Sequence, residues 1–95
     1  MYFSIMLSLL TIKTDYSYSV VRLDEIQAIE VVDIDRPDES GILTITLKGD
    51  KDDLVYSERD KERWEEAKEW LIKHTLELSM EITKASKVNK EPNQF

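Results

Sequence analysis

Residues 58–82 of the chain are ERDKERWEEAKEWLIKHTLELSMEI, and this stretch decides the fold that the sequence predicts. At about 100° per residue, its largest apolar side chains fall within a helical arc about 60° wide. The residues of this arc are Trp64, Ala67, Leu71, Leu78 and Ile82. We expect one long helix from Glu58 to Ile82, with the arc packed on a sheet formed by the preceding residues.

A second apolar row runs along the same predicted helix. Ile72, Leu76 and Met80 are spaced by four residues, roughly 120–200° away from the centre of the first arc. Three aliphatic side chains exposed in line favour association with another surface. Two explanations stay open: loops or the basic carboxyl-terminal tail cover the row, or it contacts a second copy or another protein. Among such contacts a two-fold dimer is the more frequent outcome.

Alternating apolar residues ahead of the helix predict about five strands, at residues 2–12, 16–23, 29–34, 43–48 and 53–56. Leu23, Ile26 and Ile29 are spaced by three and predict one helical turn between the second and third strands. Polar stretches predict loops at residues 13–15, 35–41 and 49–52. The predicted fold class is α+β: an antiparallel meander of about five strands, followed by one long carboxyl-terminal helix packed on one face.

A meander of strands closed by a terminal helix looks like the pleckstrin-homology-like superfold. The resemblance lies in the order of the elements and in no specific motif, and the predicted sheet has about two strands fewer than that barrel. It implies an analogy of fold and carries nothing about lipids or other ligands.

Length and composition predict a single domain at residues 1–83 with a flexible tail at residues 84–95, because the tail has no periodicity and ends in KEPNQF. The 95 residues include no cysteine, which excludes disulfides, thiol catalysis and thiolate metal sites. The apolar first 12 residues lack a positive amino-terminal region and are too short to span a bilayer. We expect a cytoplasmic protein, in the host cytoplasm if it is viral.

The formal net charge is −7, and the acidity is concentrated between Asp24 and Ser57, where ten aspartates or glutamates face three lysines or arginines. Such a field opposes nucleic-acid backbones and anionic membranes and attracts basic partners. We therefore expect no direct nucleic-acid or membrane partner. The predicted acidic partner surface consists of Asp33, Asp35, Asp38, Glu39, Asp50, Asp52 and Asp53.

The acidic loops do not match a calcium-binding loop, which needs an acid at position 5 and glycine at position 6. Counted from Asp33, these positions hold Pro37 and Asp38; counted from Asp50, position 5 holds Leu54. We expect solvated turn carboxylates, with no metal ion and no cofactor.

The chain shows no catalytic motif. His74 is its only histidine, and its place at the edge of the core arc predicts a half-buried structural role. Tyr2, Tyr16 and Tyr18 could line a sheet face, as in single-strand RNA binders, but the sequence places no basic residues among them. We expect a protein that is not an enzyme.

The leading hypothesis is a small acidic protein-interaction module, an adaptor or inhibitor, that self-associates through Ile72, Leu76 and Met80. Its partner is another protein, including a second copy of itself. The alternative is an acidic mimic of nucleic acid that inhibits a DNA- or RNA-binding protein, such as a viral anti-defence protein. That alternative requires carboxylates aligned along one surface.

Overall fold

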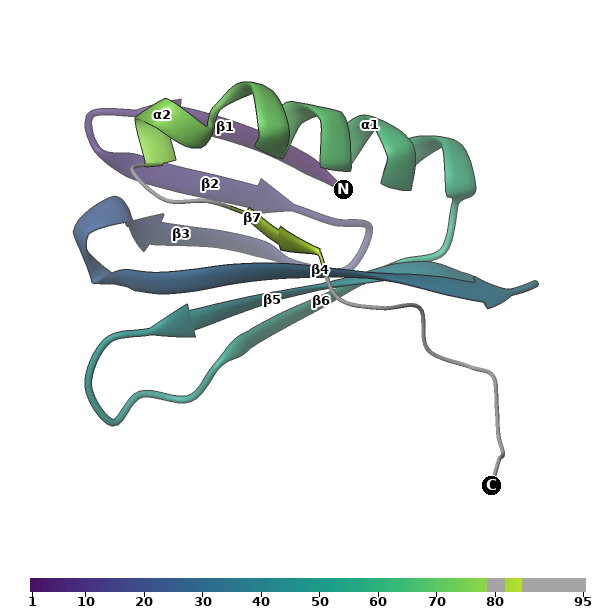
Figure 1. Cartoon of the computed structure of the whole chain (residues 1–95), viewed down its shortest axis with the longest axis horizontal. Coiled ribbons are helices and arrows are strands. Elements are labelled where there is room, and N and C mark those ends of the chain that lie inside the picture. Colours follow the sequence, from purple (N-terminus) through teal and green to yellow (C-terminus); the bar gives the residue numbers. More distant parts are fainter. Residues whose placement is uncertain (79–81, 85–95) are drawn as a thin grey trace.

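The structure is a computed structural model that describes residues 1–78 and 82–84, with the backbone alone for Glu77 and residues 82–84. Two antiparallel sheets and a helix enclose one core (Figure 1). The elements are β1 (Tyr2–Met6), β2 (Leu9–Lys13), β3 (Tyr18–Arg22), the short 3-10 helix η1 (Leu23–Glu25), β4 (Ile26–Arg36), β5 (Glu39–Leu47), β6 (Leu54–Glu58), α1 (Lys61–Lys73), α2 (Thr75–Leu78) and β7 (Ile82–Lys84).

The first sheet contains β1, β2 and β3 in that order, all antiparallel. The single strand expected at residues 2–12 is wrong, because the chain reverses at Leu7 and Ser8, whose φ angles are 54° and 66°. Positive φ at both central residues is typical of the type I′ turns that match the twist of a tight hairpin. Glycine or asparagine normally marks such a turn, and neither occurs here. The alternation of apolar residues therefore continues across Leu7 and Ser8 and predicts one uninterrupted strand.

The second sheet has the order β6-β5-β4-β7. Strands β4, β5 and β6 are antiparallel, and β7 adds to β4 in parallel, with Ile82 opposite Ile29. The α+β class with antiparallel pairing is confirmed, but the strands divide between two sheets rather than forming one meander. Because each sheet needs a cover for one apolar face, the two pack their inner faces on a shared core.

The helix is shorter than the sequence pattern indicates. α1 ends at Lys73, and His74 leaves the helical region with φ −110° and ψ 20°. The hydroxyl of Thr75 donates to the carbonyl of Ile72 at 3.3 Å, a local bond that competes with regular helix. α2 adds one short turn, and Ile82 lies in β7 instead of on the helix. The expected boundary at Ile82 was wrong because pairing with β4 overrides the helical period.

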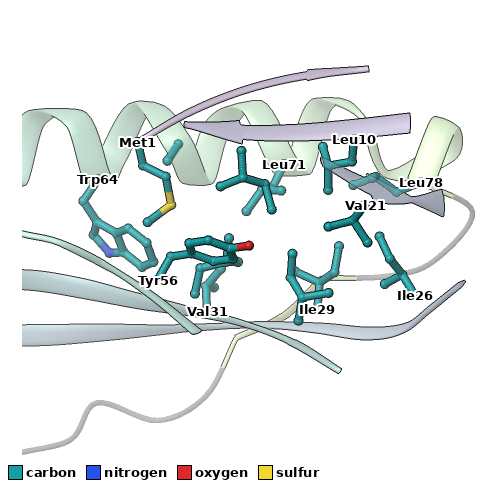
Figure 2. Close-up of a cluster of buried hydrophobic side chains, with 14 residues drawn as sticks. Met1, Leu10, Val21, Ile26, Ile29, Val31, Tyr56, Trp64, Leu71 and Leu78 are labelled. Atoms are coloured by element: carbon teal, nitrogen blue, oxygen red, sulfur yellow. The ribbon is translucent and has the colours of Figure 1, made fainter. Parts of the chain in front are cut away.

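The core lies between the two sheets, and α1 closes it along one side (Figure 2). Four of the five residues predicted for the core arc are buried, namely Trp64, Ala67, Leu71 and Leu78, which confirms those assignments. Trp64 crosses the backbone of β5 at Gly41, where an added Cβ would come within 1.9 Å of the indole. Glycine is therefore required at this position by the close approach of the ring.

An ion pair between the amino group of Met1 and Glu58 is buried where β6 leads into α1. The second carboxylate oxygen of Glu58 accepts from the backbone N–H of Asp60 at 3.0 Å. Asp60 caps the helix by accepting from the backbone N–H of Arg63 at 2.9 Å. One carboxylate thus fixes both the amino terminus and the entry into α1.

Candidate interaction surfaces

The second helical row reaches the surface as its spacing predicts. The side chain of Leu76 is 93% exposed and that of Ile72 is 65% exposed. Met80, the third member of the predicted row, lies outside the described residues. Ile72 lies in the last turn of α1 and Leu76 in α2, and large aliphatic side chains exposed to this degree are unusual for a surface that contacts only water.

Strand β1 runs beside α1 in the same direction, which places the β1–β2 turn at the same end of the molecule as α2 (Figure 1). The guanidinium of Arg63 lies 5.9 Å from the ring centre of Tyr2, and the rings of Phe3 and Trp70 are 5.2 Å apart. Because a strand rises about 3.3 Å per residue and a helix about 1.5 Å, Met6 and Leu7 reach the level of α2. Met6 is 73% exposed and Leu7 is 87% exposed. The β1–β2 turn thus adds two exposed apolar side chains at the level of α2.

His74 terminates α1 rather than facing an open site. Its Nδ1 lies 2.8 Å from the carbonyl oxygen of Trp70, which can only accept, so Nδ1 carries the proton. The imidazole is stacked on the Trp70 indole with ring centres 3.9 Å apart. These contacts hold the ring in place at the helix end, the structural role that the sequence suggests.

The predicted acidic surface divides into two groups at opposite ends of β5 (Figure 1). Asp35, Asp38 and Glu39 lie at the β4–β5 turn, whereas Asp50, Asp52 and Asp53 lie in the β5–β6 loop. A nine-residue strand separates the groups, which corresponds to roughly 25–30 Å. Glu39 also accepts from the Ser57 hydroxyl at 2.7 Å and pairs with Arg36 at 3.4 Å.

Asp33, the seventh member, turns toward α1 instead of projecting into solvent. Its Oδ1 accepts from the indole N–H of Trp64 at 2.8 Å and from Lys68 Nζ at 2.7 Å. Lys68 also contacts Glu65 at 3.3 Å. Burial by itself lowers the pKa of Lys68. The hydrogen bonds to Asp33 and Glu65 and the charges of these two acids together raise it by more, so the pKa of Lys68 lies above the ordinary 10.5.

This shift gives the Lys68 contacts a defined pH dependence. Because the pKa is higher in the folded than in the unfolded state, the stabilisation is fully present below about pH 10.5 and is lost as the pH rises through the folded value. At pH 8, denaturant unfolding should give Lys68→Met a lower free energy of unfolding than the native chain. At pH 11 the difference in unfolding free energy between the two chains should be smaller. The exposed Lys73→Met serves as control. A gap that does not change with pH would contradict the assignment.

A polar groove of about 580 Å³ lies between the β4–β5 turn and the start of α1. Its walls include both signs of charge, with Asp35 and Glu65 among the acids and Arg36, Arg59 and Lys61 among the bases. Such a mixed lining favours no single class of ligand.

The outer face of the first sheet presents a group of side chains that sequence reasoning missed. In one row across the three strands, Tyr2 lies opposite Lys13 and Lys13 lies opposite Tyr18, all three exposed. The next two rows hold Ser4, Thr11 and Val20, and then Met6, Leu9 and Arg22. None of these nine outward positions is a carboxylate, although the chain has 20 acidic residues.

The rim beside the tyrosine row brings in two arginines from the start of α1. Arg63 lies over the ring of Tyr2 and pairs with Asp15 at 3.2 Å, and these charges, Tyr2 first, raise its pKa. Arg59 reaches the hydroxyl of Tyr16 at 3.5 Å. We call Tyr2, Lys13, Tyr16, Tyr18, Arg59 and Arg63 the tyrosine–cation cluster. The bases are therefore interleaved with the tyrosines, which the linear sequence conceals.

Comparison with known proteins gives no identity, since no family model and no curated protein matches the chain. Within residues 1–78 and 82–84, no group of three or more acids or histidines gathers closely enough to hold a metal ion. Across the same described ranges, no helix has the length and apolar character needed to cross a membrane.

Proposed function

We propose that this protein is a small acidic interaction module that self-associates through the exposed apolar side chains of Ile72 and Leu76, with Met6 and Leu7 of the β1–β2 turn exposed at the same end of the molecule. The observation that carries the proposal is the nearly complete exposure of Leu76, together with the high exposure of Leu7 in the β1–β2 turn. A monomer gains nothing from exposing such side chains together, whereas a second copy would remove them from water.

The backbone at Leu7 adds support of a different kind. A bulky residue with positive φ costs on the order of 1 kcal/mol relative to glycine or asparagine, and Leu7 adopts φ 54° at the tip of the hairpin. The turn thus holds an apolar side chain outward at the expense of local stability. Such strain is typical of positions that serve binding.

A two-fold dimer is the simplest assembly for this surface. In a two-fold contact the same patch meets itself, so one continuous apolar surface is sufficient. The exposed leucines of α2 and of the β1–β2 turn would contribute apolar side chains to such a patch. Docking driven by apolar contact also tolerates the like charge of two acidic copies when salt screens it.

The solution mass at several concentrations tests the proposal. We expect light scattering to give twice 11.2 kDa for the native chain and 11.2 kDa for Leu76→Asp, because the introduced charge cannot be buried in the contact. Val55→Asp is the matched control, since Val55 is exposed on the edge strand β6, and it should leave the dimer intact. A native chain that stays monomeric up to millimolar concentration would refute self-association.

Mimicry of a nucleic-acid backbone stays the second candidate, and the arrangement of the acids favours it less. It needs carboxylates aligned along one surface, whereas the two exposed acidic groups are separated by the length of β5 and Asp33 is engaged by Lys68. Inhibition that weakens steeply with salt and disappears when Asp50, Asp52 and Asp53 become asparagine would favour mimicry over the apolar surface.

A further inference from the structure

The tyrosine–cation cluster lies at the end of the first sheet away from the β1–β2 turn. Lys13 stands between Tyr2 and Tyr18, which are roughly 10 Å apart across three strands. Exposed Val20 continues the same face in the next row. This surface is separate from the self-association patch, which begins at Met6.

The composition of the cluster is that of a protein-binding surface. Tyrosine and arginine are the residues most enriched at the energetic centres of protein interfaces, because each combines a large contact area with a polar group. Here two of the three exposed tyrosines contact arginines directly, Tyr16 with Arg59 and Tyr2 with Arg63. Those contacts hold the rings and guanidinium groups near their positions, which reduces the ordering cost of binding.

The charge of the cluster defines the complementary chemistry. Three cations, Lys13, Arg59 and Arg63, lie in the cluster, where Asp15 pairs with Arg63 and the charges of Glu58 and Asp60 also act on it, in a chain whose net charge is −7. A ligand steered to this site must therefore bring carboxylates to the cations while its apolar groups cover the tyrosines. A second copy pairing this face with itself would place cation against cation.

We propose that the tyrosine–cation cluster binds a segment of a partner protein in which apolar side chains are flanked by carboxylates. Single-stranded nucleic acid fits less well, since phosphate binding needs many cations, and here Arg63 is already paired with Asp15 and covers the ring of Tyr2. Discrete carboxylates require only the two or three cations present.

Selection of random peptides displayed on phage against the native 95-residue chain tests this inference. We expect enriched peptides to combine Asp or Glu with aromatic or aliphatic residues. A synthetic copy of an enriched peptide, followed by fluorescence anisotropy, should lose at least tenfold in affinity for Lys13→Glu and for Tyr18→Ser. The matched controls Lys51→Glu, in the β5–β6 loop, and Val55→Ser, on β6, carry similar changes away from the cluster and should bind as the native chain does.

Two further arms separate this proposal from its alternatives. The peptide should bind Leu76→Asp with native affinity, so failure of self-association leaves this inference standing. A labelled 20-nucleotide oligothymidine should bind no variant. Enriched peptides without acids, affinity indifferent to Lys13→Glu and Tyr18→Ser, or no enrichment at all would overturn the proposal. Oligothymidine binding abolished by the same substitutions would assign the cluster to nucleic acid instead.

Discussion

Replacement of Glu58 by alanine is expected to lower the free energy of unfolding by about 3–5 kcal/mol. The substitution leaves the ammonium group of Met1 buried without its counter-charge and removes the acceptor for the backbone N–H of Asp60. A domain of this size has a total stability of about 5–15 kcal/mol, so the variant should be close to unfolding. Urea denaturation of the chain with a free amino terminus measures the loss.

Two variants sharpen that measurement. Glu62→Ala removes the same group from an exposed position on α1 and should change stability by no more than about 0.5 kcal/mol. Glu58→Gln keeps the shape of the side chain and one acceptor, so its loss should fall between the two. A Glu58→Ala variant within 1 kcal/mol of the native chain would show that the buried pair contributes little.

The second large effect is expected at Trp64, where substitution by alanine should cost about 3–5 kcal/mol. Trp64 is 1% exposed, and its indole fills the space directly above Gly41. Its N–H also bonds Asp33, so the substitution removes a hydrogen bond along with the core volume. Guanidinium denaturation followed by far-UV circular dichroism avoids relying on tryptophan fluorescence.

Trp70 provides the matched comparison on the same helix. It is half-buried and packs against Phe3 and His74 at the margin of the core, so Trp70→Ala should cost clearly less than Trp64→Ala. Equal losses of unfolding free energy in Trp64→Ala and Trp70→Ala would mean that packing over Gly41 does not add to the contribution of Trp64.

The helical period predicted the buried side of α1 correctly because Trp64, Ala67, Leu71 and Leu78 repeat at spacings that local geometry fixes. The same period placed Ile82 on the helix, and there it failed. Parallel pairing with Ile29 in β4 is a contact across 53 positions, which no local window reveals. The hairpin turn at Leu7 was missed for the converse reason, since its residues lack the usual turn chemistry.

The candidate surfaces also differ in whether local spacing or contacts between distant residues produce them. Exposure of Ile72 and Leu76 follows from spacing within one element, so the sequence was sufficient to predict it. The tyrosine–cation cluster depends on strand register and on α1 meeting β1, which brings Arg63 to Tyr2 from 61 positions away. Only the folded chain shows that bases stand among the tyrosines.

The position of α1 has a consequence for how the nascent chain acquires its structure. The helix packs on β5, β1 and β6, and so completes the burial of both sheets. Six strands precede it in the chain, so during synthesis their apolar faces stay open for roughly 1–3 s at 5–20 residues per second. The segment Asp24–Ser57, which has already been made by then, carries ten of the 20 acids. Mutual repulsion between such half-finished chains keeps them apart until the helix arrives.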